Sequence, residues 1–469
     1  MIPLTLGDVA STVGGRLAGG ADPAAVVTGT STDSRTAGPG DLFVAVVGEH
    51  HDAHDFAAQA VAAGATGVLA SRPLDVPCVV VDDDTVLALG RLARGVLDRL
   101  PGLTVVGITG SSGKTSTKDL MAQVLGALGP VVAPQGSFNT EVGLPVTALT
   151  VEPSSRVLVA EMGARGIGHI AYLCTIAPPR VGVVLNVGTA HISEFGTRED
   201  IARGKGELVE AVPDAGDGGV AVLNADDPLV RSMASRTRGR VLLFGRSSDA
   251  DVRAEDEVLD GEGRASFTLV TADVRVPVSL RLHGAHHVLN ALAVAAAALS
   301  LGVPAVEVAA RLSSAQPRSK WRMEVATTAA GITVVNDAYN ANPESMLAAL
   351  DALVSMGRAT ADRAARRTWA VLGEMRELGE HSDAEHERVG RAAAERGIDH
   401  VVAVGPGALG VARGAQAAGG GSVVSAVPDV GAAVGLLRAE TAPGDVVLVK
   451  ASRASGLETV ALALTEVTA

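Results

Sequence analysis

The stretch that decides the fold runs from Gly107 to Ser116 and reads GITGSSGKTS. An apolar, β-branched run over residues 103–109 leads into it, and a helical pattern with Leu120 and Met121 on one side follows it. A glycine-rich turn between a strand and a helix lets backbone N–H groups face an anion, and the start of the helix adds positive potential. The stretch therefore predicts a phosphate-binding loop rather than an ordinary glycine turn that caps a helix.

Inside this loop, we expect Lys114 to reach the β- and γ-phosphates of a nucleotide and Thr115 to hold Mg²⁺. The sequence departs from the strict P-loop pattern at Ile108, which stands five positions before Gly113 where that pattern has glycine. It therefore fits a shorter Gly-x-x-Gly-Lys-Thr variant. The other residues expected to contact the phosphates are Gly110, Ser111, Ser112 and Ser116.

The amino-acid composition limits the classes of protein to which this chain can belong. The 469 residues carry a formal net charge of −13 and are 47% apolar, which fits several domains with sizeable cores. Aromatic residues make up 2% of the chain, and the acidic balance gives no general attraction to polyphosphate, so we expect no nucleic-acid partner. Cys78 and Cys174 are too few for a disulfide framework or a cysteine zinc site.

The sequence gives no sign of secretion or membrane insertion. The first residues lack the basic start and the apolar core of a signal peptide, and the acidic Asp8 stands where that core would lie. The most apolar stretch, 291–310, contains Gly302, Pro304 and Glu307, which predicts a buried helix and its exit and not a membrane span. We expect a cytoplasmic protein that acts as a monomer.

Three segments of the chain differ in their patterns. Residues 1–101 alternate short apolar strands with alanine-rich helices, which predicts a small α/β unit. Residues 102–315 alternate strands and helices around the phosphate loop, which predicts a parallel sheet covered on both faces, with an antiparallel appendage over 265–282. Residues 316–469 predict a doubly wound, Rossmann-like unit without a glycine fingerprint. The expected fold class is therefore α/β in three domains.

Two residues follow strands of the central segment, at the sheet edge where ligands bind. Glu161 ends the strand 157–160, where its carboxylate would suit Mg²⁺; a solvated glutamate is the alternative. His191 follows the strand 181–185 and is a candidate metal ligand, against an ordinary core or surface histidine. Lys205 lies in the helical stretch after His191 and by itself would be interpreted as a solvated lysine.

Together these residues resemble the Mur ligase family, ATP-dependent amide-forming enzymes of peptidoglycan precursor synthesis. The resemblance covers essentially the whole chain and includes the order of three domains. It implies ATP and Mg²⁺ as cofactors, and a peptide carboxylate that becomes an acyl phosphate before an amine attacks it. The residues implied to be catalytic are Lys114, Glu161, His191, Lys205 and Arg322, and those implied to hold metal are Thr115, Glu161, His191 and Lys205, the last as a carbamate.

Four further segments carry the resemblance. They read SFNTEVGLP (137–145), HHVLNA (286–291), NDAYNANP (336–343) and GEMRELG (373–379). The last resembles the branch of the family that adds D-alanyl-D-alanine to UDP-N-acetylmuramoyl-tripeptide. The chain also lacks the Asp-Asn-Pro-Arg tetrad that is typical of the diamino-acid-adding branch. The resemblance therefore implies those two small-molecule substrates.

The resemblance also implies binding residues. For ATP, Asn290 would contact the base and Asp337 the ribose, while Asn340 would lie near the reacting groups. Arg322 would reach the phosphates, with Arg318 and Lys320 as rival candidates for that role. The residues implied to bind the UDP-linked peptide or the dipeptide are Ser31, Thr32, Asp33, Ser34, Arg35, Asn139, Thr140, Glu141, Asn342, Arg376, Lys450 and Arg453.

Two positions depart from the family pattern, because Ser112 stands for an asparagine and Asn336 for a first aspartate. Two other interpretations remain open on the sequence. One is another amide ligase of this family, of the diamino-acid-adding or folylpolyglutamate type, and residues 373–379 argue against it. The other is a catalytically silent nucleotide-binding protein, and the intact Lys114 and Glu161 argue against that.

Overall fold

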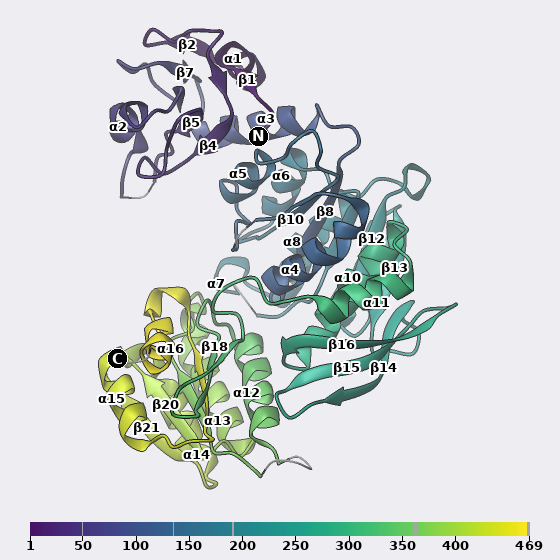
Figure 1. The fold of residues 1–469 in the computed structure, drawn as a ribbon, viewed down its shortest axis with the longest axis vertical. Helices are drawn as coiled ribbons and strands as arrows, with labels where there is room; N and C mark the ends of the chain where they lie inside the picture. Colours follow the sequence, from purple (N-terminus) through teal and green to yellow (C-terminus); the bar gives the residue numbers. More distant parts are fainter. Residues whose placement is uncertain (49, 135, 190–191, 360–363, 467–469) are drawn as a thin grey trace.

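The structure is a computed structural model and describes residues 1–48, 50–134, 136–189, 192–359 and 364–466. Figure 1 shows three α/β units in sequence order along the long axis of the molecule, with the N-terminal unit at one end and the C-terminal unit at the other. Each unit is built on its own sheet of five, nine or six strands. The three-domain α/β architecture agrees with the fold class expected from the sequence, while the boundaries after residues 101 and 315 remain predictions.

The N-terminal unit has a five-stranded sheet in the order β2-β7-β6-β5-β4, in which only the edge strand β2 is antiparallel. A two-stranded ribbon, β1 with β3, lies beside it. The elements are β1 (Leu4–Thr5), α1 (Leu6–Val13), β2 (Arg16–Ala18), β3 (Val26–Val27), β4 (Gly29–Ser31), β5 (Asp41–Val44), α2 (Ala57–Ala62), β6 (Gly67–Ala70), β7 (Cys78–Val80) and α3 (Thr85–Leu97).

The central unit has a nine-stranded sheet in the order β16-β15-β14-β13-β12-β11-β8-β10-β9. Its elements are β8 (Thr104–Thr109), α4 (Lys114–Val124), β9 (Val131–Val132), α5 (Gly143–Ala148), β10 (Val157–Glu161), α6 (His169–Ile176), β11 (Val181–Val184), α7 (Ile192–Phe195), α8 (Arg198–Glu210), β12 (Val220–Asn224), α9 (Pro228–Ser232), β13 (Arg240–Gly245), β14 (Val252–Leu259), β15 (Arg264–Val270), β16 (Arg275–His283), α10 (His286–Ser300) and α11 (Ala305–Ser314).

The position of β8 in this sheet decides where a ligand can bind. β8 pairs in parallel with β10 on one side and β11 on the other, so the chain order changes direction at this strand. The carboxyl ends of such neighbouring parallel strands leave a crevice at the edge of the sheet. The phosphate loop, Glu161 at the end of β10 and the segment after β11 all lie at this edge.

The expected antiparallel appendage is the edge of the central sheet itself. β14 pairs in parallel with β13, and β15 and β16 continue the same sheet in antiparallel register. The alanine-rich helix α10 packs against α4 and β13 and is buried over most of its surface, because its small side chains allow close packing. No helix in the described part of the chain combines the length and apolar character that crossing a bilayer demands.

The C-terminal unit has a six-stranded sheet in the order β17-β18-β22-β19-β20-β21, in which only the edge strand β17 is antiparallel. Its elements are β17 (Glu324–Thr327), β18 (Thr333–Asn336), α12 (Pro343–Gly357), β19 (Thr368–Leu372), α13 (Ser382–Glu395), β20 (His400–Val404), α14 (Leu409–Ala418), β21 (Val423–Val427), α15 (Val430–Glu440), β22 (Val446–Lys450) and α16 (Glu458–Thr465).

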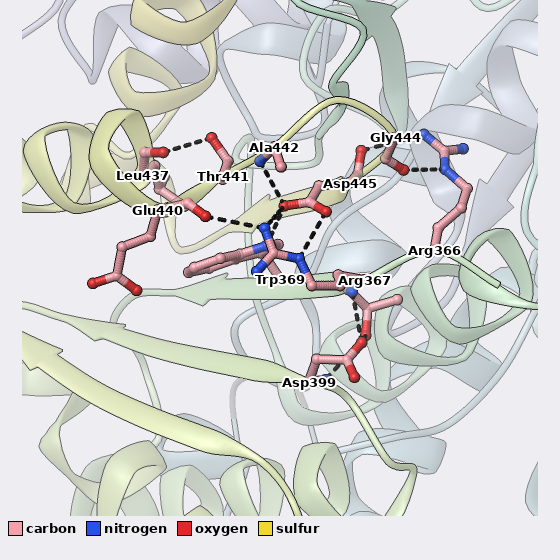
Figure 2. Close-up of polar contacts among 11 residues, drawn as sticks. Arg366, Arg367, Trp369, Asp399, Leu437, Glu440, Thr441, Ala442, Gly444 and Asp445 are labelled. Atoms are coloured by element: carbon pink, nitrogen blue, oxygen red, sulfur yellow. Dashed lines mark hydrogen bonds and ion pairs between the residues drawn. The ribbon is translucent and has the colours of Figure 1, made fainter.

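A polar cluster fastens the amino ends of β19 and β22 (Figure 2). The buried carboxylate of Asp445 accepts hydrogen bonds from Arg367 Nε at 3.0 Å and Nη2 at 2.7 Å, from Trp369 Nε1 at 3.0 Å and from the backbone N–H of Ala442 at 3.0 Å. Trp369 also stacks on the His400 ring at a centroid distance of 3.6 Å. These contacts lie at the opposite end of the strands from Lys450, so they stabilise the sheet without entering the site described below.

Candidate active site

The phosphate loop has the backbone shape that its glycines predict. Gly113, the last residue before α4, has φ +81°, a left-handed conformation that favours glycine. A Cβ at this position would lie 2.7 Å from Asn290 Oδ1, so glycine also allows the close approach of α10. The loop therefore leaves the first N–H groups of α4 facing the crevice, beside the residue expected to contact the base.

The segment after β11 braces the phosphate loop from the other side. Asn186 Oδ1 accepts a hydrogen bond from Ser112 N–H at 2.9 Å, and Asn186 Nδ2 donates to Ser112 O at 3.2 Å. The Gly188 N–H donates to Ser111 Oγ at 2.9 Å. The loop conformation thus depends on side-chain and backbone groups that are about 75 residues away in the sequence.

Lys114 lies inside the crevice, where Nζ donates to Gly110 O at 2.6 Å. Burial lowers the pKa of its ammonium, the negative charge of Glu161 acts in the opposite direction, and the positive charge of Arg322 lowers it further. Lys114 forms no ion pair with another residue in the described part of the chain. Its ammonium can therefore form charge-assisted hydrogen bonds with a bound polyanion.

Thr115 and Glu161 form an oxygen-rich cluster at the start of α4. Thr115 Oγ1 lies 2.8 Å from Ser137 Oγ and 3.5 Å from Glu161 Oε1, and Asn139 Nδ2 donates to Glu161 Oε1 at 2.9 Å. Glu161 is buried, and its Oε2 has no hydrogen-bond partner among the described residues. A buried carboxylate oxygen without a donor costs free energy, and a hard cation would satisfy it.

Arg322 comes from the linker after the central unit and enters the same cluster. Its Nη2 donates to Thr115 Oγ1 at 3.2 Å and to Ser137 Oγ at 3.3 Å, and the guanidinium lies 4.2 Å from the centroid of the Tyr339 ring. The neighbours Trp321 and Met323 have left-handed φ values of +58° and +50°, which is uncommon for large side chains. This backbone path directs Arg322, rather than Arg318 or Lys320, toward the phosphate loop.

The C-terminal loop 336–342 closes another side of the crevice. The Asp337 carboxylate accepts a hydrogen bond from Met323 N–H at 3.0 Å and pairs with Lys450 Nζ at 2.6 Å. Lys450 Nζ also donates to Asn340 O at 2.9 Å. Lys450, predicted to bind substrate, therefore holds this loop together while it lines the crevice. Burial lowers the pKa of Lys450, and Asp337 raises it.

Two further arginines of the C-terminal unit face the crevice. Arg376 Nε donates to Glu374 Oε2 at 3.1 Å. Arg453 pairs with Glu458 at 2.5 Å, and its guanidinium lies 4.0 Å from the centroid of the Trp321 ring. Both side chains are about half exposed, and a guanidinium has five N–H donors, so each can still bind an anionic group of a ligand.

Lys205 lies on α8 and is buried, which differs from the solvated lysine that its sequence position alone suggests. Burial and the positive charge of Lys114 hold the pKa of Lys205 well below its ordinary value, which favours the neutral amine. It lines the same crevice as Lys114 and Glu161.

His191, the other predicted metal ligand after β11, lies outside the described residues, so its role remains a prediction. No group of three or more His, Cys, Asp and Glu suited to a metal occurs in the described part of the chain.

These side chains surround a single cavity of about 750 Å³ between the central and C-terminal units. It brings together predicted residues from both units, namely Ser111, Ser112, Gly113, Lys114, Thr115, Ser116, Asn139, Thr140, Glu141, Glu161, Lys205, Asn290, Arg322, Asp337, Asn340, Asn342, Arg376, Lys450 and Arg453. Gly110 is not one of the lining residues and contributes its carbonyl to Lys114.

The N-terminal candidates form a separate cluster. Ser31 ends β4, and Ser31 Oγ donates to Asp33 O at 2.8 Å. The Asp33 carboxylate pairs with Arg35 at 2.6 Å. Ser31, Thr32, Asp33, Ser34 and Arg35 do not line the cavity, so their predicted role requires a substrate long enough to reach the N-terminal unit.

Some lining residues were missed when site residues were predicted from the sequence. Ser137 and Tyr339 lie within the segments 137–145 and 336–343, and Asn186 directly follows the predicted strand 181–185, so their positions carried a signal. Arg165 and His169 also line the cavity, and no motif marks them. Both follow β10, whose carboxyl end lies at the same edge of the sheet as the phosphate loop.

Three models of one protein family match this chain in sequence order. The Mur ligase family catalytic domain matches residues 26–94, the Mur ligase middle domain matches residues 108–298, and the Mur ligase glutamate ligase domain matches residues 321–453. The UDP-N-acetylmuramoyl-tripeptide–D-alanyl-D-alanine ligase of Mycobacterium tuberculosis H37Rv is 48% identical, over 99% of this chain and 98% of that protein. The ligase of the same name from Escherichia coli K12 is 36% identical, over 99% of both chains.

Solved structures give the same grouping. The crystal structure of MurF from Acinetobacter baumannii has a TM-score of 0.88 and 33% identity, over 99% of both chains. MurF ligase from Thermotoga maritima in complex with ADP has a TM-score of 0.80 and 32% identity, over 94% of this chain and 97% of that one. With such similarity along its full length and a phosphate loop facing the C-terminal unit across one cavity, this chain belongs to the Mur ligase family.

Proposed function

We propose that this protein joins D-alanyl-D-alanine to UDP-N-acetylmuramoyl-tripeptide with ATP, and so forms UDP-N-acetylmuramoyl-pentapeptide, ADP and phosphate. The observation that carries the proposal is the shared cavity, in which the phosphate loop faces the C-terminal residues Asn340, Arg376 and Arg453. Such a cavity can hold a nucleotide triphosphate and an acceptor substrate side by side. The names of the relatives that match the full length of the chain support the choice of substrates.

The reaction has two steps whose atoms balance. A carboxylate oxygen of the tripeptide attacks the γ-phosphorus of ATP, the bond from phosphorus to the β–γ bridging oxygen breaks, and ADP leaves. The amine nitrogen of the dipeptide then attacks the acyl carbon, and the bond from that carbon to the phosphate oxygen breaks. The amine gives up a proton, and inorganic phosphate leaves. Both the first nucleophile and its target are anionic, so the site must neutralise charge and hold them in line.

The residues of the phosphate loop meet the first requirement. Lys114 presents its ammonium to the β- and γ-phosphates, and the N–H groups at the start of α4 bind the phosphate oxygens. Arg322 reaches the same region from the linker, where its hydrogen bonds to Thr115 and Ser137 set its direction. Positive charge from both units therefore converges on the place where the γ-phosphoryl group would lie.

Thr115 and Glu161 are the residues that would hold Mg²⁺. The unpartnered Oε2 of Glu161 and the nearby Thr115 hydroxyl are hard oxygen donors of the kind that Mg²⁺ prefers, so the residues fit the ion. When bound, Mg²⁺ would draw negative charge from the phosphate oxygens and help to orient the γ-phosphoryl group. A second metal held by His191 and a carbamate on Lys205 remains part of the proposal.

The other predicted residues divide between the two ends of the substrates. Asn290 would contact the base of ATP, and Asp337 the ribose. Residues 31–35 would bind the UDP group, and Asn139, Thr140 and Glu141 the peptide that extends from it. Arg376 and Arg453 would bind the carboxylate of the dipeptide through bidentate hydrogen bonds.

A phosphate-release assay tests this proposal. We expect release by the wild-type protein only when ATP, UDP-N-acetylmuramoyl-tripeptide and D-alanyl-D-alanine are all present, with lysine and diaminopimelate compared at the third peptide position. Lys114→Met is the matched control for contaminating ATPase activity. Release that depends on a diamino acid or glutamate in place of the dipeptide would contradict the choice of substrate. No release with any amine acceptor would contradict a ligase.

The same proposal covers location and assembly. ATP and a UDP-linked precursor are cytoplasmic metabolites, which supports a cytoplasmic enzyme. We also propose that the protein acts as a monomer. Size-exclusion chromatography with light scattering tests the monomer.

A further inference from the structure

The first turn of α12 crosses from the C-terminal unit onto two loops of the central unit. Glu344 Oε1 accepts hydrogen bonds from both the backbone N–H and the hydroxyl of Thr189, each at 2.9 Å. Asn342 Nδ2 donates to Ser111 O in the phosphate loop at 3.2 Å. The Gly188 N–H donates to Ser111 Oγ, which joins the two loops to each other. One helix end therefore contacts a connected pair of loops.

The surroundings of Glu344 match its carboxylate closely. A Cβ on Gly188 would lie 2.7 Å from Glu344 Cδ, so only glycine leaves room for the carboxylate at this distance. Glu344 Oε2 is buried and has no hydrogen-bond partner among the described residues. The position near the start of α12 favours a negative charge, since the helix dipole is positive there. The carboxylate has thus lost most of its water, and Thr189 supplies its hydrogen bonds from another unit.

A second contact of the same kind lies a few residues further along the chain. Ser193 Oγ, in α7, donates to Glu377 O of the C-terminal unit at 3.0 Å. Glu377 has a left-handed φ of +64°, and a Cβ on Gly379 would lie 3.0 Å from Ser193 Cβ. The C-terminal unit therefore contacts the central unit both at Thr189 and at Ser193.

We propose that Glu344 is a positioning residue that couples the seating of the C-terminal unit to the conformation of the phosphate loop. It does not line the cavity and acts through Thr189, Gly188 and Ser111. The nucleotide side and the dipeptide side of the site come from different units, so amide formation requires both to be held in register. The kinetic part of this inference rests on the proposed function, whereas the coupling itself does not.

Three substitutions separate this role from a simple effect on the helix. Glu344→Asp keeps the negative charge at the start of α12 but shortens the side chain, so its carboxylate no longer reaches Thr189. Glu344→Gln keeps the length and an acceptor oxygen but removes the charge. Thr189→Val removes the hydroxyl and keeps the backbone donor. A role confined to helix stability predicts a wild-type Glu344→Asp protein, whereas the coupling role predicts that Glu344→Asp is the more harmful change of the two at Glu344.

Hydrogen exchange and kinetics provide the readouts. We expect Glu344→Asp to speed exchange in the peptide containing Gly188 and Thr189 by about tenfold, the effect of losing hydrogen bonds to a charged acceptor. We expect kcat to fall by about tenfold, with the KM for the UDP-linked peptide changed less than about twofold. Adding Thr189→Val to Glu344→Asp should cause no further loss, because both changes break the same contact.

Gly188→Ala approaches the contact from its other side and should reproduce the effect of Glu344→Asp. Wild-type exchange and wild-type kcat in both Glu344→Asp and Gly188→Ala would overturn the inference. If the wild-type protein releases no phosphate with the two proposed substrates, the proposed function fails, and the exchange experiment still decides whether Glu344 organises these loops.

Discussion

Arg322 Nη2 lies 3.2 Å from Thr115 Oγ1, although 207 positions separate the two residues in the sequence. The contact joins the linker before the C-terminal unit to the first turn of the helix that follows the phosphate loop. The same guanidinium bonds Ser137 and lies over the Tyr339 ring. These contacts fix the orientation of the Arg322 guanidinium beside Thr115, one of the residues proposed to hold Mg²⁺.

Arg322→Lys tests whether this geometry matters. A lysine ammonium is compact and cannot both stack on Tyr339 and bond the two hydroxyls, so we expect the affinity for a non-hydrolysable ATP analogue to fall about tenfold. Isothermal titration calorimetry measures the change. The matched control is Arg318→Lys, an exposed arginine of the same linker, which should bind as the wild type does. Equal binding by the wild type and both variants would contradict the phosphate-contacting role of Arg322.

Lys205 provides a test of the carbamate. A buried neutral amine can add CO₂ to give a carbamate anion and a proton, which would place a carboxylate-like ligand in the cavity. We expect Lys205→Ala to lose activity by at least about a hundredfold and to regain part of it in formate or acetate. Lys205→Arg keeps a cation and fills the space, so it should stay inactive in the same salts. Wild-type activity of Lys205→Ala without added acid would exclude the carbamate.

Two histidines at the start of α10, the half-buried His286 and the buried His287, predict a loss of stability in acid. Burial lowers the pKa of His286 to about 4, and that of His287 also lies well below 6.5. Below pH 6.5 these two histidines therefore bind protons in the unfolded chain, while in the folded chain they remain neutral. The free energy of unfolding should fall by up to about 1.4 kcal/mol per pH unit for each histidine as the pH decreases toward 4. The contribution of both neutral histidines to stability is therefore complete above pH 6.5 and is lost progressively as the pH falls from 6.5 toward 4.

Replacing His286 with asparagine removes one of these groups. The decrease in Tm between pH 7 and pH 5 should be smaller in His286→Asn than in the wild type, as measured by differential scanning calorimetry. His381→Asn, at an exposed histidine, serves as the control and should leave the decrease unchanged. An unaltered pH dependence in His286→Asn would show that this histidine titrates in the folded protein as it does in the unfolded chain.

The polar cluster around Asp445 predicts a stability effect with no catalytic effect (Figure 2). Asp445→Asn replaces an acceptor of four hydrogen bonds with an amide whose N–H₂ group faces donors. We expect a loss of about 2–3 kcal/mol and a decrease of about 5–10 °C in the Tm of the C-terminal unit. Phosphate release at 25 °C should stay at the wild-type rate, because the cluster lies at the far end of the strands from the cavity.

Glu440→Gln is the control for this change. Glu440 belongs to the same cluster, but only its backbone carbonyl accepts a hydrogen bond from Arg367, and the residue is exposed. Its Tm should stay within about 1 °C of the wild type. A Tm for Asp445→Asn that also stays within this range would show that the carboxylate contributes little to the stability of the sheet.

Much of the fold could be predicted from the sequence. The strand–turn–helix pattern around Gly107–Ser116 predicted β8, the loop and α4, since glycine, Lys-Thr and the apolar periodicity all reflect local requirements. The alternation of strands and helices predicted three α/β units for a similar reason. The edge strand β21 and the short β6 were not predicted. Ser425 and Ala426 interrupt the apolar run of β21, which lies exposed or half-exposed, and β6 begins with glycine and ends with alanine, two residues of low strand propensity.

The site itself was decided by the tertiary structure. Sequence motifs supplied Lys114, Thr115 and Glu161, because each stands at the end of a strand or the start of a helix. The hydrogen bonds of Glu344 with Thr189 and of Arg322 with Thr115 join residues that no local pattern relates. They exist because the C-terminal sheet packs its first helix and its linker against the loops of the central sheet. Local chemistry thus determined which residue types are present, and the packing of separate units determined which of them meet.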